Sequence, residues 1–262
     1  MKAIICKNMK RTDDRVIIEK VINKLQDFGI EADFSDFVRE DCDVIITVGG
    51  DGTILHHGKD AARKGLPLLG INTGRLGFMT SIELSELDKL NLLNRGDYHI
   101  CSRMLLEAEV GKDSFLVLND AVIYRGADSK LPEFNVSINN RTVSEFRADG
   151  LILNTPTGST AYALSAGGPI IEPWLDCIGF TPICAHSLLG RPAVFSSDYP
   201  VTVKVGEEPE RKVLISVDGE KGVELQKNQN VIIKKSDLRF SLIDLNGGSF
   251  HNAIREKLMK PR

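Results

Sequence analysis

The sequence predicts two domains, an α/β domain with a parallel, Rossmann-like sheet and then a β-rich domain. Three observations support this prediction. Strand and helix patterns alternate through the first 100 residues, which is typical of a parallel sheet covered by helices. Residues 44–48 form a continuous β-branched run, as in a strand that is buried on both faces. Near Cys101 the pattern changes to a succession of strands.

The first domain is expected to alternate three strands with three helices. The apolar run at residues 3–6 predicts the first strand, and apolar residues at helical spacing predict a helix over 12–28 that ends at Gly29. The remaining elements expected in this domain are a strand at 44–48, a helix at 53–64, a strand at 66–71 and an amphipathic helix marked by Leu84, Leu87, Leu90 and Leu93.

The second domain is expected to consist mainly of strands, interrupted by a helix after Thr160. We place the boundary so that the α/β domain covers residues 1–100 and the β-rich domain covers 101–248. The C-terminal helical stretch, 249–262, is a candidate to pack back on the first domain. The strands expected in the second domain lie at 116–118, 122–124, 134–138, 151–153, 201–205, 213–217, 231–233 and 240–245.

Composition excludes several classes of function. Lys and Arg number 33 and Asp and Glu 36, a formal net charge of -3, so we expect neither nucleic-acid nor membrane binding. No apolar stretch is long enough for a membrane span or the core of a signal peptide. The five cysteines lack metal-ligand spacing, and an odd number without a secretory signal indicates a reducing compartment. We therefore expect a cytoplasmic protein.

Residues 48–57, VGGDGTILHH, place a carboxylate inside a glycine-rich turn. Such a turn between a buried strand and a helix usually holds phosphate, which Asp51 would repel. The spacing is not a Rossmann fingerprint, because Leu55 stands where that pattern needs glycine, and no Gly-Lys-Ser/Thr follows as in a Walker A loop. Two interpretations stay open: Asp51 points into a ligand cleft, or it caps the following helix.

A second segment, 155–162, reads TPTGSTAY and carries four hydroxyl residues within six positions. It follows a predicted strand and leads into a helix, and its hydroxyl and free N–H groups suit hydrogen bonding to ribose, adenine or phosphate. An ordinary turn with a helix N-cap explains one or two of these residues. Two acidic segments, Asn119-Asp120 and 217–220 (VDGE), are interpreted as turns when taken alone, although a buried acid in the second stays possible.

No metal site made of protein ligands is expected. His56 and His57 are adjacent, so on a helix they point about 100° apart and cannot chelate as an i, i+4 pair would.

Together these segments resemble the NAD kinases. GGDGT by itself is shared with diacylglycerol and sphingosine kinases, and phosphofructokinases carry a similar loop, whereas the block at 147–169 is far more specific. The segments that carry the resemblance are GGDGT (49–53), NTGRLGF (72–78), Asn119-Asp120, RADGLILNTPTGSTAYALSAGGP (147–169), PICAHSL with Arg-Pro (182–192) and VDGE (217–220).

The resemblance implies an NAD kinase-like two-domain fold, with 101–248 as the NAD-binding domain. It implies transfer of the γ-phosphoryl group of ATP, or of polyphosphate, to the 2′-hydroxyl of the adenosine ribose of NAD, which gives NADP. Asp51 would accept the hydroxyl proton. Mg²⁺ would be held mainly through nucleotide phosphates, and the site would be completed across the interface of a homodimer or homotetramer.

The resemblance also implies which residues bind the two substrates. The phosphate donor would be bound by Gly49, Gly50, Gly52 and Thr53. NAD would be bound by Asp51, Gly52, Asn119, Asp120, Arg147, Asp149, Thr157, Thr160, Ala161, Tyr162 and Ser165.

The sequence departs from the family pattern at two positions. Many members have Asn-Glu where this chain has Asn119-Asp120, and proline commonly stands where Ala185 does.

Two alternatives stay open, a GGDGT lipid kinase and a non-catalytic NAD or NADP sensor. The first would lack the TPTGST block, and the second would not need Asp51. The sequence does not decide between ATP and polyphosphate, between NAD and NADH, whether NADP regulates the protein, or the oligomer size.

Overall fold

The chain folds into two compact units, one of Met1–Arg103 with Arg239–Arg262 and one of Met104–Leu238. Two strands, β6 (His99–Val110) and β17 (Val231–Asp244), each contain a boundary between the units. The computed structural model describes residues 1–7, 13–74, 77–127, 130–186, 190–206, 212–226 and 229–259.

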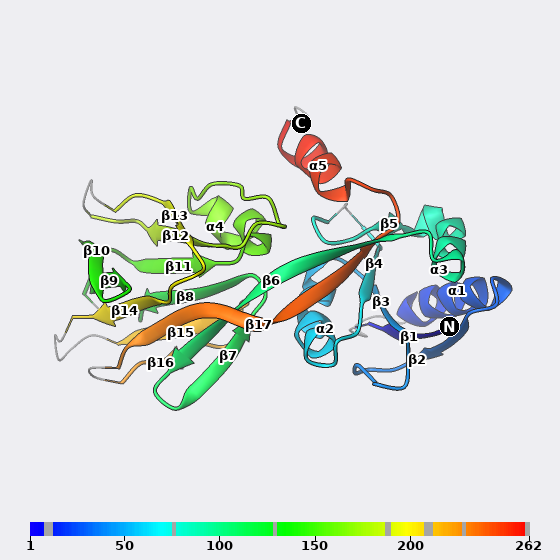
Figure 1. The fold of residues 1–262 in the computed structure, drawn as a ribbon, viewed down its shortest axis with the longest axis horizontal. Helices are drawn as coiled ribbons and strands as arrows, with labels where there is room; N and C mark the ends of the chain where they lie inside the picture. Colours follow the sequence, from blue (N-terminus) through cyan, green and yellow to red (C-terminus); the bar gives the residue numbers. More distant parts are fainter. Residues whose placement is uncertain are drawn as a thin grey trace. The chain divides into compact units, whose positions relative to one another are not determined.

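The first unit is built on a parallel sheet in the order β4–β3–β1–β2 (Figure 1). The end of β17 and the short β5 (Ile82–Glu83) both pair with β4 in parallel. Its four main strands are β1 (Lys2–Cys6), β2 (Glu31–Phe34), β3 (Val44–Val48) and β4 (Leu68–Asn72). Every residue of β3 and β4 is buried, as expected for central parallel strands.

Helices cover both faces of this sheet. On one face, α1 (Asp13–Asp27) and the 3₁₀-helix η1 (Leu84–Leu90) share an apolar cluster with alternate residues of β1, β3 and β4. On the other face lies α2 (Asp51–Arg63), whose Ile54 packs where Gly70 of β4 leaves space. The remaining helical elements of this unit are α3 (Asn91–Arg95), α5 (Ser249–Ile254) and the π-helical turn η3 (Arg255–Met259).

The second unit contains an antiparallel sheet in the order β13–β12–β11–β8–β15–β16. A second set of antiparallel strands contains β10–β9–β14, the part of β17 in this unit, and β6 with β7. The bounds are β7 (Asp113–Val117), β8 (Asp120–Arg125), β9 (Glu133–Ile138), β10 (Arg141–Arg147), β11 (Gly150–Asn154), β12 (Cys177–Ile183), β13 (Ala193–Ser196), β14 (Val201–Val205), β15 (Val213–Val217) and β16 (Val223–Glu224).

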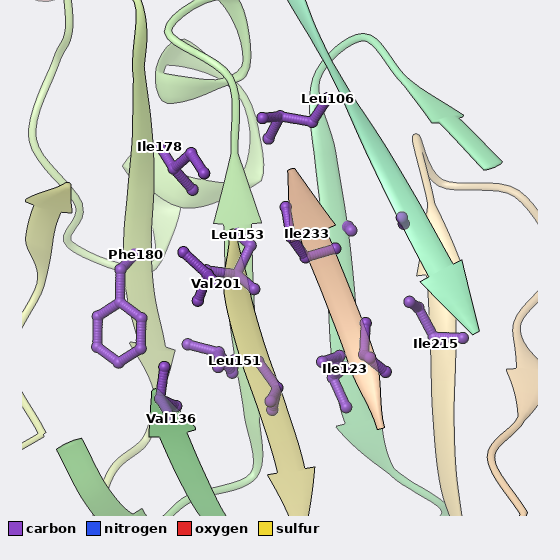
Figure 2. Packing of buried hydrophobic residues seen from close by; sticks show 14 of the residues in the cluster. Leu106, Ile123, Val136, Leu151, Leu153, Ile178, Phe180, Val201, Ile215 and Ile233 are labelled. Atoms are coloured by element: carbon purple, nitrogen blue, oxygen red, sulfur yellow. The ribbon is translucent and has the colours of Figure 1, made fainter. Parts of the chain in front are cut away.

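One apolar core joins the two sets of strands in the second unit, and Figure 2 shows side chains from both. Ile123, Leu151 and Phe180 come from the β13–β16 sheet, and Val136 and Val201 come from the other set. Each such side chain contributes about 1.5–3 kcal/mol when fully buried. The core therefore fixes the strand ends that carry the polar residues described below.

The predicted fold class, a parallel α/β region and a β-rich region, is confirmed. Two helices differ from the expectation. The stretch from Leu84 begins as 3₁₀-helix, because Glu86 has non-helical dihedral angles and its side chain bonds back to Glu83 N–H. After β11, the chain forms only η2 (Thr157–Thr160) and a single turn, α4 (Tyr162–Ser165). Among the described residues, no helix is long and apolar enough to cross a membrane.

Candidate active site

The GGDG loop, residues 49–52, connects the end of β3 to the start of α2. Gly49 donates its N–H to the carbonyl of Ile71 at 2.9 Å, which ties the loop to β4. A Cβ at Gly49 would stand 3.0 Å from Cβ of Thr53, so the turn requires glycine at this position. Cβ atoms at Gly50 and Gly52 would meet nothing within 4 Å. The loop is thus open beside Gly50 and Gly52, where a ligand could approach the start of α2.

Asp51 is the first residue of α2 and does not cap it. The N-cap is Gly50, which makes no side-chain capping bond, so the interpretation of Asp51 as an N-cap is wrong. The carboxylate instead accepts hydrogen bonds from the N–H groups of Phe78 at 2.8 Å and Met79 at 3.0 Å. These two bonds, from a segment remote in sequence, fix the direction of the half-buried carboxylate.

The segment that holds Asp51 begins at Asn72, at the end of β4. Gly77 donates its N–H to Oγ1 of Thr80 at 2.9 Å, and a Cβ at Gly77 would stand 2.7 Å from Cγ of Asp51. Of the stretch at 72–78 that resembles the family, Arg75 and Leu76 lie outside the described residues. In the part of the chain that the structure describes, no group of three or more His, Cys, Asp or Glu could hold a metal ion.

A second cluster of predicted residues lies in the β-rich unit, where residues 118–120 form a corner before β8. The backbone of this Asn-Asp corner is bound to the turn at 155–160: Thr155 donates its N–H to the Asn119 carbonyl at 2.9 Å and its hydroxyl to the Leu118 carbonyl at 2.6 Å. A Cβ at Gly158 would stand 2.8 Å from Cα of Asn119. The structure therefore brings two predicted segments into contact.

Two polar atoms at this contact are buried without a hydrogen-bond partner among the described residues, Oδ1 of Asn119 and Oγ1 of Thr157. Buried polar groups in native proteins nearly always have a partner, so these two atoms are candidates for binding a ligand. Thr160 donates its hydroxyl to the Thr157 carbonyl at 3.2 Å and is half-buried.

Asp120 is buried, with 5% of its surface exposed. Burial, and in addition the negative charge of Asp218, raises the pKa of the Asp120 carboxyl to about 7. An acid of this kind titrates near neutral pH, where a small change of environment alters its charge.

The remaining predicted residues of this unit are placed differently. Arg147 is exposed and pairs with Glu133 at 3.1 Å, whereas Asp149 accepts a hydrogen bond from Nε of Arg125 at 2.6 Å. Arg147 and Asp149 precede β11, and the Asn-Asp corner lies beside the other end of β11. The structure therefore does not bring these two residues to the corner. Beyond the turn, Ala161 is half-buried and Tyr162 and Ser165 are exposed.

Family comparison decides the membership of the chain. Residues 3–98 match the ATP-NAD kinase N-terminal domain, and residues 118–245 match the ATP-NAD kinase C-terminal domain. The chain belongs to the NAD kinase family. Among similar proteins, the NAD kinase of Caldanaerobacter subterraneus is 37% identical over 98% of both chains. The NAD kinase of Desulforamulus reducens is 40% identical over 83% of this chain and 77% of its own.

Solved structures of NAD kinases and NADH kinases have the same fold. Yeast NADH kinase, complexed with NADH, matches with a TM-score of 0.85 and 25% identity, over 100% of this chain and 89% of its own. An NAD kinase from Archaeoglobus fulgidus, in complex with ATP, matches with a TM-score of 0.76 and 26% identity over 96% of both chains.

Two residues that build the candidate site, Thr155 and Asp218, are not among the site residues predicted from the sequence. The sequence places Thr155 in the hydroxyl-rich run. It places Asp218 in a segment that carries the family resemblance and that is interpreted as a turn, with a buried acid left possible. Asp218 accepts hydrogen bonds from the N–H groups of the Asn-Asp corner, about 100 residues away in the chain. Asp218 reaches the corner because β15 pairs with β8, and no local sequence pattern reveals this pairing.

The segment at 182–192 is described in part. His186 donates its N–H to the Arg147 carbonyl at 2.8 Å, which places this segment beside the start of β11. Ser187, Leu188 and Leu189 lie outside the described residues.

Proposed function

We propose that the protein transfers the γ-phosphoryl group of ATP, or of polyphosphate, to the 2′-hydroxyl of the adenosine ribose of NAD, forming NADP. Family membership supports the reaction, and related proteins bind NADH and ATP. The observation that carries the assignment to this chain is a pair of buried atoms that have no hydrogen-bond partner within the described part of the chain, Oδ1 of Asn119 and Oγ1 of Thr157.

These two atoms match the hydrogen-bonding edge of adenine. The amide oxygen of Asn119 can accept from the exocyclic amine, and the Thr157 hydroxyl can donate to a ring nitrogen. Thr160 lies in the same turn and Ala161 and Tyr162 follow it directly, and these three residues would provide the surface on which the base rests. A ligand at this place relieves the cost of two unsatisfied buried groups.

The other NAD contacts follow from the placement of the strands. Asp120 adjoins Asn119 and as a carboxylate can accept hydrogen bonds from ribose hydroxyls. Arg147 and Asp149 lie at the opposite end of β11, whose 5 residues span roughly 16 Å. This separation supports a role for Arg147 and Asp149 toward the nicotinamide half or the diphosphate. Ser165 is assigned to the same part of the ligand from the family resemblance alone.

In the proposed mechanism, Asp51 accepts the proton of the 2′-hydroxyl while the hydroxyl oxygen attacks the γ-phosphorus. A P–O bond to this phosphorus forms, the bond to the bridging oxygen breaks, and ADP leaves. The two N–H groups that Asp51 binds hold its carboxylate in one orientation, which suits a reaction that depends on alignment. Gly49, Gly50, Gly52 and Thr53 would form the donor-phosphate site. The N–H groups of Gly50 and Gly52 would receive phosphate, because those of Gly49 and Thr53 already donate to the carbonyls of Ile71 and Gly50.

A divalent cation fits this loop as a companion of the nucleotide. The open positions beside Gly50 and Gly52 leave room for phosphate oxygens, which are the hard ligands that would hold the cation. Mg²⁺ bound with the nucleotide would neutralise charge on the phosphates and on the transferred group.

We also propose that the protein acts in the cytoplasm as a homodimer or homotetramer. The described cysteines are all unpaired, which suits a reducing compartment. Ile170, Trp174 and Leu175 expose 40–50% of their surface within one short segment, which suits an interface between subunits.

The test is an assay of the purified protein with NAD, ATP and Mg²⁺, in which NADP is measured by a dehydrogenase specific for NADP. We expect NADP to accumulate in proportion to enzyme. A protein that binds NAD but forms no NADP with ATP or polyphosphate would be a sensor, and the proposed reaction would be refuted.

A further inference from the structure

Asp218 is an acidic residue outside the predicted site, and it forms four hydrogen bonds with the Asn-Asp corner. Its Oδ1 accepts from the N–H groups of Asn119 at 2.7 Å and Asp120 at 3.2 Å, and its Oδ2 accepts from Leu118 at 3.0 Å. In return, Asp218 donates its own N–H to the Asp120 carbonyl at 2.8 Å. One residue thus binds four main-chain groups of the Asn-Asp corner.

The other two main-chain groups of the corner are bound as well. The Leu118 and Asn119 carbonyls accept from the hydroxyl and the N–H of Thr155. Every N–H and C=O of residues 118–120 therefore has a partner, and four of these six groups depend on Asp218. The backbone of the corner is therefore held at every main-chain polar group, which fixes the direction in which its two side chains leave the backbone.

The local fold explains why an aspartate occupies this position. Residues 217–220 form a tight turn in which Glu220 donates its N–H to the Val217 carbonyl at 2.9 Å. Asp218 and Gly219 both have positive φ, 51° and 75°, a conformation that favours Asp-Gly. The register that pairs Val217 with Ala121 places this turn beside the corner. Of the residues that tolerate such a turn, aspartate alone provides two oxygens that only accept.

We propose that Asp218 is a positioning residue for the acceptor substrate: it fixes the Asn-Asp corner so that Asn119 and Asp120 are presented to the adenosine half of NAD. This inference rests on the proposed function. Asp218 also acts on Asp120 through its charge. The strands paired with β8 place Asn154 and Val217 beside the start of β8, and Asp218 is the charged group that acts together with burial on the Asp120 carboxyl.

The experiment uses the full chain with Asp218→Asn. This variant keeps the shape of the turn, but its amide offers an N–H₂ group to one backbone N–H that the carboxylate had accepted. We expect KM for NAD to rise about tenfold, the loss typical of hydrogen bonds to a charged group, with KM for ATP changed less than twofold.

The pH profile separates positioning from simple destabilisation. If the Asp120 carboxylate binds the ribose, kcat/KM for NAD rises with pH as Asp120 ionises, and Asp218→Asn moves this rise to lower pH. A residue that only stabilised the fold would lower the melting temperature without moving the profile. Asp198→Asn, which neutralises an exposed carboxylate bonded to Ser196, is the matched control and should keep both KM values.

Asp218→Gly is the second variant, because glycine accepts positive φ and removes the carboxylate entirely. We expect it to raise KM for NAD further than Asp218→Asn. Either variant with the wild-type KM for NAD and an unmoved pH profile would overturn the positioning role. A wild-type protein that forms no NADP would refute the proposed function instead, so the two failures are distinguishable.

Discussion

Gly77 lies so close to Asp51 that a Cβ atom at residue 77 would stand 2.7 Å from Cγ of the carboxylate. The same segment donates the two N–H groups that Asp51 accepts, from Phe78 and Met79. The orientation of the proposed base thus depends on a residue without a side chain. Glycine at this position is explained by a close approach rather than by an unusual backbone conformation.

Gly77→Ala should therefore displace the Asp51 carboxylate while leaving the sheet intact. We expect kcat to fall at least tenfold, since misalignment by about 1 Å can cost a factor of 100, with KM for NAD changed little. Steady-state kinetics would measure this. Gly74→Ala is the matched control, because a Cβ there would meet nothing within 4 Å, and it should keep the wild-type kcat. Equal rates for the two variants would contradict the role of Gly77.

Asp51→Asn tests the base directly. The amide cannot take up the hydroxyl proton, so we expect kcat to fall by a factor of about 100 to 10,000 while NAD still binds. Turnover and calorimetric binding of NAD would be measured side by side. Asp60→Asn changes an exposed carboxylate on the same helix, paired with Arg63, and should be nearly neutral. An Asp51→Asn enzyme with wild-type turnover would refute the assignment of the base.

The sequence was informative where the decisive contacts are local. The strand, glycine turn and helix around Asp51 follow from hydrophobic periodicity, because each element satisfies its pattern within a few residues. The partners of Asp51 could not be predicted in this way, since they come from Phe78 and Met79 after another strand has intervened. The role of Asp218 was equally hidden, because an Asp-Gly turn looks the same whether its carboxylate faces solvent or a corner 100 residues away.

His57 gives the fold a dependence on acid pH. It is buried in α2 with 3% exposed, its Nε2 has no partner among the described residues, and burial lowers its pKa from 6.5 to about 4. The folded protein thus keeps His57 neutral at pH values where the unfolded chain protonates it. The free energy of unfolding therefore has its full value above pH 6.5 and decreases as the pH falls toward 4. The shift corresponds to at most about 3 kcal/mol.

His57→Gln should remove this acid dependence. Chemical denaturation at pH 7 and at pH 4.5 would show a smaller loss of unfolding free energy in the variant than in the wild type. Asp120, with its raised pKa, acts in the opposite direction over part of this range, and it is unchanged in both proteins. His56→Gln, at the exposed neighbouring position, should retain most of the wild-type loss. Identical pH dependence in wild type and His57→Gln would show that His57 is not the responsible group.

Thr157→Val separates stability from substrate binding. Valine has nearly the shape of threonine but lacks Oγ1, a buried atom without a partner among the described residues. Removing such an atom should leave the free energy of unfolding unchanged or raise it by about 1 kcal/mol. If the hydroxyl binds adenine, KM for NAD should nevertheless rise about tenfold, because the base loses a hydrogen bond in a buried site.

Thr181→Val provides the comparison that makes this result specific. Thr181 lies in β12 and its buried Oγ1 likewise has no partner among the described residues, but it is not in the turn at 155–160. Thermal unfolding and KM for NAD would be measured for both variants. We expect similar stability changes in the two and a raised KM only in Thr157→Val. If KM stays at the wild-type value in both, the Thr157 hydroxyl does not contact the substrate, and adenine recognition must depend on Asn119 and the main chain of the turn.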